Sequence, residues 1–230
     1  MIITIDGPTA SGKSTTAAHL AARLDFLYIN SGLLFRGLAY VFAIATHEIE
    51  QDENKKDFVR IFDSLLEQMH YSYDKVTGAA ILFHEKNITS LLKTPEISTM
   101  ASVIGTNEIL RDLVTAWQRR MASGNNVVVE GRDAGSVVFP EADLKLFLTA
   151  LLEVRAARWQ KDQEQRGLIL TLAEATQQIF ERDERDSKRN VAPLIIPEGA
   201  LVIDNGELTS EETVENIVNS VRSMLPEVSC

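Results

Sequence analysis

Residues 7–14 read Gly-Pro-Thr-Ala-Ser-Gly-Lys-Ser and match the phosphate-loop pattern G-x-x-x-x-G-K-[ST] at every fixed position. Gly7 and Gly12 allow the backbone to form a concave loop whose N–H groups point inward. Lys13 supplies a cation for the β- and γ-phosphates of a nucleoside triphosphate, and the Ser14 hydroxyl can ligate Mg²⁺. The alternative is a plain glycine turn before a helix. The apolar run 2–6 before the loop and the amphipathic segment after it favour the triphosphate site.

The loop and the residue that follows it therefore form the predicted ATP site. Its members are Gly7, Pro8, Thr9, Ala10, Ser11, Gly12, Lys13, Ser14 and Thr15. Mg²⁺ is expected at Ser14, with phosphate oxygens and waters completing its coordination.

A second polar segment follows the most apolar run of the chain, residues 127–129. Glu130 ends this run, and a carboxylate in that place is the usual second element on the metal side of a phosphate loop. Arg132 and Asp133 follow between two glycines, which indicates a tight backbone that presents both side chains. Bonding of this Arg and Asp only to each other is the alternative. A phosphate loop on a neighbouring strand favours a functional role.

Arg182, Asp186 and Arg189 are spaced three or four residues apart, so they share one helical face. Two arginines on one face suit an anionic phosphate, and an aspartate between them suits ribose hydroxyls. The competing interpretation is a solvated face stabilised by i,i+4 ion pairs.

Two weaker signals remain. Ser31 stands where a strand gives way to a helix, and Arg36 is a lone cation in that apolar helix. Their alternatives are an N-cap and a snorkelling side chain. Arg155 and Arg158 begin a charged helix and could close over transferring phosphates, although such a pair is more often a solvated helix face.

The composition narrows the class of protein. The chain has 230 residues and a net charge of -10, which disfavours a nucleic-acid groove. Its single cysteine, Cys230, excludes a disulfide scaffold and a thiolate metal site and favours a reducing compartment. Without a basic leader or a long apolar stretch, we expect a soluble cytoplasmic protein.

The hydrophobic pattern predicts α/β architecture with a five-stranded parallel sheet and helices on both faces. The expected strands are 2–6, 27–29, 126–130, 144–148 and 201–204. The expected helices are 13–24, 33–46, about 56–69, a segment starting at 95, 106–121, 152–165, 172–186 and a segment starting after 209. Thr94, Thr106, Thr171 and Thr209 are the expected caps. Two short runs, 69–74 and 79–85, predict an antiparallel hairpin inserted outside the main sheet, and 191–199 reads as loop.

Taken together and in this order, these motifs resemble the bacterial cytidylate kinases, a family of nucleoside monophosphate kinases. The resemblance rests on the strand and loop at 3–8, on Ser31-Gly32 with Arg36, on 131–133 with 137–140, and on 181–183 through 192–194. It covers the chain from residue 2 to about 225. The family commonly has Asp where this chain has Asn30 and Glu130.

The resemblance implies a P-loop core domain, an inserted monophosphate-binding domain with a small antiparallel sheet, and a helical lid. The implied core is 1–36, 106–152 and 168–230, the monophosphate-binding domain is 37–105, and the lid is 153–167. The implied acceptor site is Ser31, Arg36, Ser102, Arg111, Arg132, Asp133, Arg182, Asp186 and Arg189. Within it, Ser102, Arg111 and Asp133 would read cytosine, Arg36, Arg132 and Arg189 would hold phosphate, and Arg182 with Asp186 would hold ribose. The implied catalytic residues are Lys13, Arg132, Arg155, Arg158 and Arg189.

The implied activity is phosphoryl transfer from Mg·ATP to CMP or dCMP, in pyrimidine nucleotide metabolism. ATP, CMP and dCMP are then the expected partners of a monomer that binds neither nucleic acid nor membrane. Two other functions stay open at this point. One is a related kinase acting on UMP or a small alcohol, and the other is an impaired or non-catalytic homologue that only binds the triphosphate.

Overall fold

The computed structural model of the protein describes residues 1–51 and 58–224. It divides into two compact units, one formed by residues 1–29 with residues from 119 onward and the other by residues 30–118. The predicted division into core, monophosphate-binding domain and lid concerns how the parts bind nucleotides, and it stays a prediction. The predicted link at 48–56 and the first residues of the helix expected from 56 fall partly outside the described residues, and so does Cys230.

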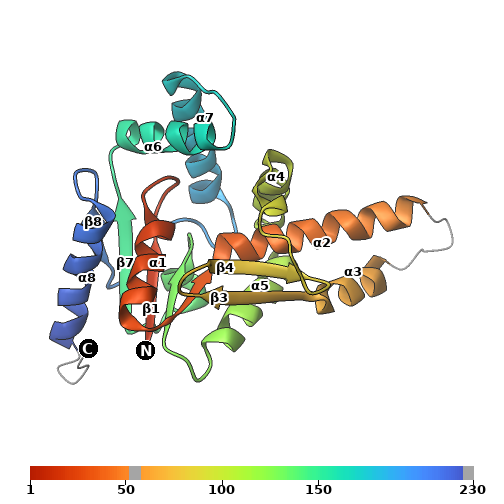
Figure 1. The fold of residues 1–230 in the computed structure, drawn as a ribbon, viewed down its shortest axis with the longest axis horizontal. Coiled ribbons are helices and arrows are strands. Elements are labelled where there is room, and N and C mark those ends of the chain that lie inside the picture. The colour runs from red at the N-terminus through yellow and green to blue at the C-terminus, as the bar shows by residue number, and fades with distance from the viewer. Residues whose placement is uncertain (52–57, 225–230) are drawn as a thin grey trace. The chain divides into compact units, whose positions relative to one another are not determined.

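The first unit is built on a five-stranded parallel sheet with the order β2-β6-β1-β7-β8 (Figure 1). Its strands are β1 (Ile2–Asp6), β2 (Leu27–Asn30), β6 (Val127–Glu130), β7 (Leu144–Thr149) and β8 (Leu201–Asp204). The central strand β1 pairs with β6 and β7, with Ile3 opposite both Val128 and Leu144. These residues are almost fully buried because both faces of a parallel sheet are covered, which is why the strands read as continuous apolar runs.

The helices of this unit follow the strands. They are α1 (Lys13–Leu24), the π-helix η2 (Ala134–Val138), α6 (Leu152–Gln165), α7 (Leu172–Lys188) and α8 (Ser210–Met224). Helix α1 packs on β6 and α8, and α6 packs on α7. Ala17, Leu20 and Ala21 of α1 are completely buried, as their helical spacing predicts. The predicted fold class is confirmed in the sheet, its helices and the separate small sheet.

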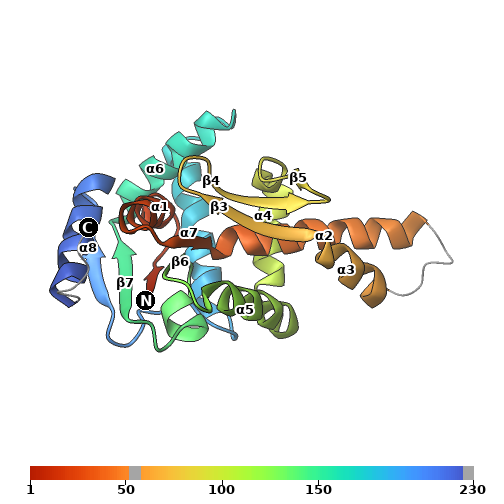
Figure 2. The same cartoon turned by 60° about the horizontal axis from the view of Figure 1, so that its bottom comes forward.

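The second unit combines helices with that small sheet. Its helices are α2 (Ser31–Gln51), α3 (Phe58–Glu67), the 3-10 helix η1 (Leu91–Lys93), α4 (Pro95–Ile104) and α5 (Glu108–Ala122), the last of which continues into the first unit. The antiparallel sheet has the order β3 (Met69–Asp74), β4 (Gly78–Phe83) and β5 (Lys86–Asn87) (Figure 2). The predicted hairpin is therefore confirmed, with Tyr71 opposite Ile81. The two-residue strand β5 carries no sequence pattern and was not predicted.

The helix expected from residue 33 begins two residues earlier, because α2 starts at Ser31 and the Leu33 N–H donates to Asn30 Oδ1 at 2.8 Å. The alternative interpretation of Ser31 as an N-cap is therefore wrong, since Asn30 takes that place. The expected cap Thr106 is wrong by one residue, because the Leu110 N–H donates to Asn107 Oδ1 at 3.1 Å. Asparagine is the stronger N-cap of these two neighbours.

The other three expected caps are confirmed. Thr94 accepts a bond from the Ile97 N–H, and Thr171 and Thr209 each form a capping box with the glutamate three residues later. These boxes begin α7 and α8 as predicted.

Gly7 offers a sharp test of the loop backbone. Its φ is +148°, and a Cβ there would lie 2.0 Å from the Leu148 carbonyl oxygen. We expect Gly7→Ala to lower the free energy of unfolding by at least about 3 kcal/mol, because a backbone clash adds to dihedral strain. Gly124→Ala is the matched control, since Gly124 has φ +75° with open space around it. The control should cost about 1 kcal/mol. Urea unfolding measures both, and equal losses would contradict the clash.

Candidate active site

The phosphate loop joins the end of β1 to the start of α1, where its backbone takes left-handed conformations. Ala10 has φ +58° and Gly12 has φ +91°. A Cβ at Gly12 would lie 2.7 Å from Asn205 Nδ2, so this glycine is required both by its φ and by the closeness of Asn205. The Lys13 ammonium folds back over the loop and donates to the Pro8 carbonyl at 2.5 Å. The Lys13 ammonium is thus held against the backbone of the loop.

Lys13 is a buried cation with another cation nearby. Burial lowers the pKa of the Lys13 ammonium well below its ordinary value, and the charge of Arg132 lowers it further. The carboxylates of Glu130 and Asp183 act in the opposite direction. An anion in the loop would favour the charged form of Lys13, because attraction between opposite charges is strong in a desolvated place.

The side chains expected to organise Mg²⁺ meet beside this loop. Ser14 Oγ donates to Glu130 Oε1 at 2.8 Å, and the Tyr28 hydroxyl donates to the same oxygen at 3.3 Å. Within residues 1–51 and 58–224, no group of three or more His, Cys, Asp or Glu side chains could hold a metal by itself. A hydroxyl and one carboxylate fit Mg²⁺, which prefers few protein oxygens together with phosphates and water. Tyr28 was not predicted, because it lies inside the short strand β2 and nothing in the sequence distinguishes it from the strand's other buried residues.

Arginines and aspartates alternate around Arg132. Its Nε donates to Asp186 Oδ2 at 2.8 Å, and its Nη2 donates to the hydroxyl of Thr9 at 3.1 Å. Arg189 Nη2 donates to Asp133 Oδ1 at 3.3 Å, and a second Arg189 nitrogen lies 4.0 Å from Asp186. Arg132 and Asp133 therefore each have a partner in the segment 186–189 and are not bonded only to each other.

The charge state of Asp186 follows from this arrangement. Burial would raise the pKa of the Asp186 carboxyl, but the nearby guanidinium groups, led by Arg132 and Arg182, lower it below its ordinary value. The carboxylate is therefore ionised at neutral pH and can accept hydrogen bonds. Arg182 lies one turn before it on α7.

The two predicted lid arginines both lie against backbone of the first unit. Arg155 is buried and donates to the carbonyls of Ala150 and Thr9 and to Asp183 Oδ2, the last at 2.5 Å. Arg158 donates to the Asn205 carbonyl at 2.8 Å and to its side chain at 3.2 Å. Their assignment to transferring phosphates stays a prediction. Asp183 and Asn205 were not among the predicted site residues.

The second unit holds the remaining predicted acceptor residues. Ser31 Oγ donates to Gln118 Oε1 at 2.5 Å. Arg111 is 4% exposed, donates to the Gly105 carbonyl at 2.9 Å and stacks over the Phe35 ring at 5.3 Å. This orientation fixes a planar fork of donors.

Arg36 lies one turn after Gly32, where a Cβ would be 3.4 Å from its Nη1. Ser102 is half-buried on α4, which packs on α2. The second unit therefore holds four predicted acceptor residues on α2, α4 and α5, namely Ser31, Arg36, Ser102 and Arg111. Their predicted roles stay predictions.

Asp6 is a buried carboxylate that the sequence analysis did not select. Its two oxygens accept from the N–H groups of Ala134 and Gly135 at 2.8 and 2.7 Å. The side chain therefore holds the start of η2, directly after Arg132 and Asp133. Burial raises the pKa of the Asp6 carboxyl to about 6, although both N–H bonds lower it.

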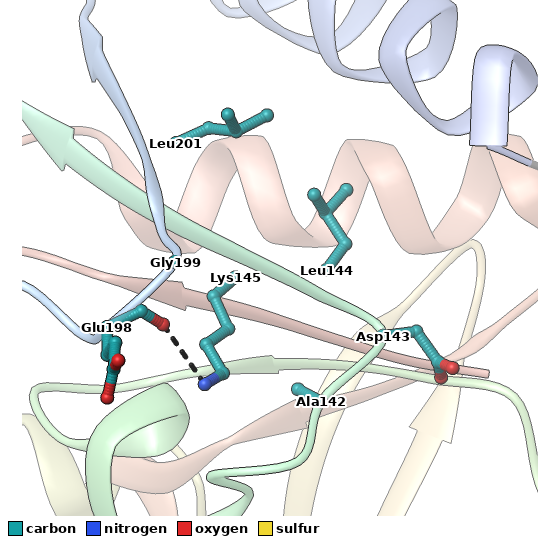
Figure 3. A pocket seen from close by; sticks show the side chains of 7 residues that line it. All are labelled: Ala142, Asp143, Leu144, Lys145, Glu198, Gly199 and Leu201. Carbon is teal, nitrogen blue, oxygen red and sulfur yellow. Dashed lines mark hydrogen bonds between the residues drawn. The ribbon is translucent and has the colours of Figure 1, made fainter.

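One cavity of about 220 Å³ lies away from the phosphate loop, at the amino ends of β7 and β8 (Figure 3). Two of its charged side chains, Lys145 and Asp143, have partners. Lys145 Nζ donates to the Glu198 carbonyl, and Asp143 Oδ2 accepts from the Ile2 N–H. Nothing in this cavity resembles a nucleotide site.

Comparisons with known proteins show the family of the chain. A model of the cytidylate kinase family matches residues 3–223. The chain belongs to the cytidylate kinase family. A cytidylate kinase of Chlamydia caviae is 40% identical over 228 residues, covering 98% of this chain and 100% of that protein. A cytidylate kinase of Thermotoga sp. strain RQ2 is 37% identical over 223 residues, covering 97% of each.

Among solved structures, shikimate kinase from Bacteroides thetaiotaomicron covers 98% of each chain with a TM-score of 0.50 and 14% identity. That likeness concerns the fold alone, and it supports the P-loop kinase architecture. The family model and the two cytidylate kinases confirm the predicted family. In the part of the chain that the structure describes, no helix is both long and apolar enough to cross a membrane.

Asp6 predicts a specific pH dependence of stability. Its pKa in the folded protein is about 6, raised from 3.8. The folded state therefore binds more protons between these values, and stability falls as the pH rises through this window. We expect the wild type to lose about 1.4 kcal/mol of unfolding free energy relative to Asp6→Asn between pH 5 and pH 7.

Urea unfolding of both proteins at several pH values measures this difference. Asp143→Asn is the control, because Asp143 also accepts a backbone N–H but at an exposed site. The control should follow the wild type at every pH. Parallel curves for the wild type and Asp6→Asn would contradict the raised pKa.

Proposed function

We propose that this protein transfers the terminal phosphoryl group of Mg·ATP to CMP or dCMP, giving ADP and CDP or dCDP. One observation carries the proposal: the phosphate loop lies within hydrogen-bonding reach of an alternating Arg–Asp cluster, with Arg132 bonded to both Thr9 and Asp186. A triphosphate loop alone would suit many enzymes. A loop bonded directly to a second anion-binding cluster suits an enzyme that joins two phosphates, and the chain aligns with cytidylate kinases over nearly its whole length.

The donor is held by the loop and Lys13. Backbone N–H groups and the N-terminus of α1 surround the β-phosphate, and the ammonium turns from the Pro8 carbonyl to the phosphates. Ser14 and Glu130, which are hydrogen-bonded to each other, would hold Mg²⁺, and the ion would supply positive charge that offsets the charge of the donor phosphates.

The acceptor is held by the arginines. Arg132 and Arg189, with Arg36, bind its phosphate, and Asp186 with Arg182 binds its ribose. The ionised Asp186 carboxylate suits hydroxyl donors. Ser102, Arg111 and Asp133 read the cytosine edge, and the buried, stacked guanidinium of Arg111 gives that edge a fixed donor plane.

The reaction needs little proton transfer, because a phosphate oxygen of the acceptor is itself the nucleophile. The protein's work is to bring two anions together and to neutralise the charge that develops between them. Arg132 is suited to this because Asp186 and Thr9 already hold its guanidinium in one orientation. Little reorganisation is then required when both substrates bind.

The three-part division completes the proposal. Residues 1–36, 106–152 and 168–230 form the core, 37–105 form the monophosphate-binding domain, and 153–167 form a lid that carries Arg155 and Arg158. Closure of the lid excludes water, which would otherwise compete as the acceptor. We expect the enzyme to work as a cytoplasmic monomer.

An acceptor panel tests the proposal directly. With Mg·ATP as donor, we expect CMP and dCMP to exceed UMP, AMP and a small alcohol by at least about tenfold in kcat/KM, because only cytosine matches the predicted base-reading residues. ADP release coupled to NADH oxidation gives the rates. A lead for UMP or the alcohol would favour the related kinase. ATP hydrolysis that no acceptor accelerates would favour a nucleotide-binding homologue.

Removal of the central cations should abolish turnover without unfolding the protein. We expect Lys13→Ala and Arg132→Ala to lower kcat/KM by about 10³-fold or more, because each removes charge from the transferring phosphates. Lys161→Ala is the control, since Lys161 is an exposed lysine on α6. Circular dichroism melting checks the fold of all three. Full activity in either site variant would overturn the assignment.

A further inference from the structure

Thr9 is held by side chains from three separate segments. Its N–H donates to Asp183 Oδ1 at 2.8 Å, and its carbonyl accepts from Arg155 Nη1 at 3.0 Å. Its hydroxyl accepts from Arg132, as described above. Thr9 is 2% exposed, so water does not compete for these groups. One residue of the phosphate loop is thus bound on both sides of its backbone.

Asp183 is the centre of this arrangement. One carboxylate oxygen accepts from Thr9, and the other accepts from Arg155 at 2.5 Å, in an ion pair whose side chains are only 17% and 11% exposed. Arg155 also bonds the Ala150 carbonyl just before α6. The carboxylate therefore connects the phosphate loop, α6 and α7.

The loop has a physical need for such support. Ala10, which directly follows Thr9, has φ +58°, a left-handed conformation that is strained for a residue with a Cβ. Gly7 and Gly12 also have positive φ, which glycine adopts without this cost. A strained residue persists where its surroundings hold it. A buried ion pair is a costly way to stabilise a fold, because both charges lose their hydration. Its presence here is better explained by the geometry that it imposes.

The position of Asp183 on α7 gives that geometry a consequence for the acceptor. Arg182 precedes it by one residue, and Asp186 follows it by three, so all belong to the same turn of helix. A shift of Thr9 relative to α7 would move the donor loop relative to these residues. Arg132 joins the same two segments, since it bonds both Thr9 in the loop and Asp186 on α7.

We propose that Asp183 is a positioning residue that sets the phosphate loop in register with the acceptor-binding turn of α7. It touches neither nucleotide and acts through the Thr9 backbone and Arg155. The positioning role of Asp183 rests on the proposed kinase function, whereas the hydrogen bond from the Thr9 N–H to Asp183 does not. The proposed function and this hydrogen bond can therefore be tested separately.

The test compares Asp183→Asn and Asp183→Ala with Glu184→Gln. Glu184 is the neighbouring carboxylate on α7, and it makes only a solvent-exposed ion pair with Lys188, so the control removes the same charge. We expect Asp183→Ala to lower kcat/KM by about 30-fold or more for both ATP and CMP. Asparagine can still accept from Thr9 but cannot pair with Arg155, so Asp183→Asn should fall between the wild type and alanine. The control should stay within about twofold of the wild type.

Amide hydrogen exchange gives a readout that does not depend on turnover. Exchange at the Thr9 N–H should quicken in Asp183→Ala and not in Glu184→Gln, and calorimetric titration should show weaker ATP binding in step with it. If the wild type phosphorylates no cytidine nucleotide, the proposed function fails while these two measurements still test the bond to Thr9. If Asp183→Ala does not fold, Asp183→Asn decides the matter.

Unchanged exchange at Thr9, or kinetics that match those of Glu184→Gln, would overturn the positioning role. Loss of melting temperature with unchanged kcat/KM would also overturn it, because it would show that Asp183 only stabilises the fold.

Discussion

The site depends on the pairing of buried cations with carboxylates. Lys13 and Arg132 lie close enough for the charge of one to lower the pKa of the other. Two such groups cannot share a desolvated place without opposite charge nearby. Asp186 pairs with Arg132, Asp183 with Arg155 and Asp133 with Arg189, so each guanidinium is held before any substrate arrives. The rest of the first unit serves to bring these partners together.

Helix α7 is the element that makes this pairing possible. Its two inward carboxylates, Asp183 and Asp186, are three residues apart and so lie on one face, directed at different arginines. Arg189 follows directly at the end of the helix and bonds both the Ala192 carbonyl and Asp133. The charged residues of α7 therefore lie on two faces of the helix. Asp183 and Asp186 pair with arginines on one face, and the exposed pair Glu184–Lys188 lies on the other.

The sequence predicts the architecture and the family well, because both depend on local patterns. Buried strands read as apolar runs, and the phosphate loop has fixed spacing. What it cannot predict are contacts that join distant segments. Asp6 accepts from the N–H groups of Ala134 and Gly135, which lie 128 and 129 residues away in the sequence. These bonds hold the start of the π-helix η2, which no local sequence pattern predicts. The partner of Arg155 is likewise set by the packing of α6 on α7.

The cap of α5 was wrong for a different reason. Thr106 and Asn107 are adjacent candidates, and the stronger N-cap, asparagine, takes the place. The start of α2 follows in the same way from Asn30, whose side-chain oxygen accepts from the Leu33 N–H.

A chain with a net charge of -10 is an unexpected binder of anionic nucleotides. The positions of three of its carboxylates explain how it can bind them. Asp6 and Asp183 accept backbone N–H groups at the edges of the two phosphate-handling segments, and Asp186 accepts from Arg132. Their negative charge is thus bound to donors of the protein. Local arrangement therefore outweighs total charge, because the potential at a desolvated place is set mainly by the nearest groups.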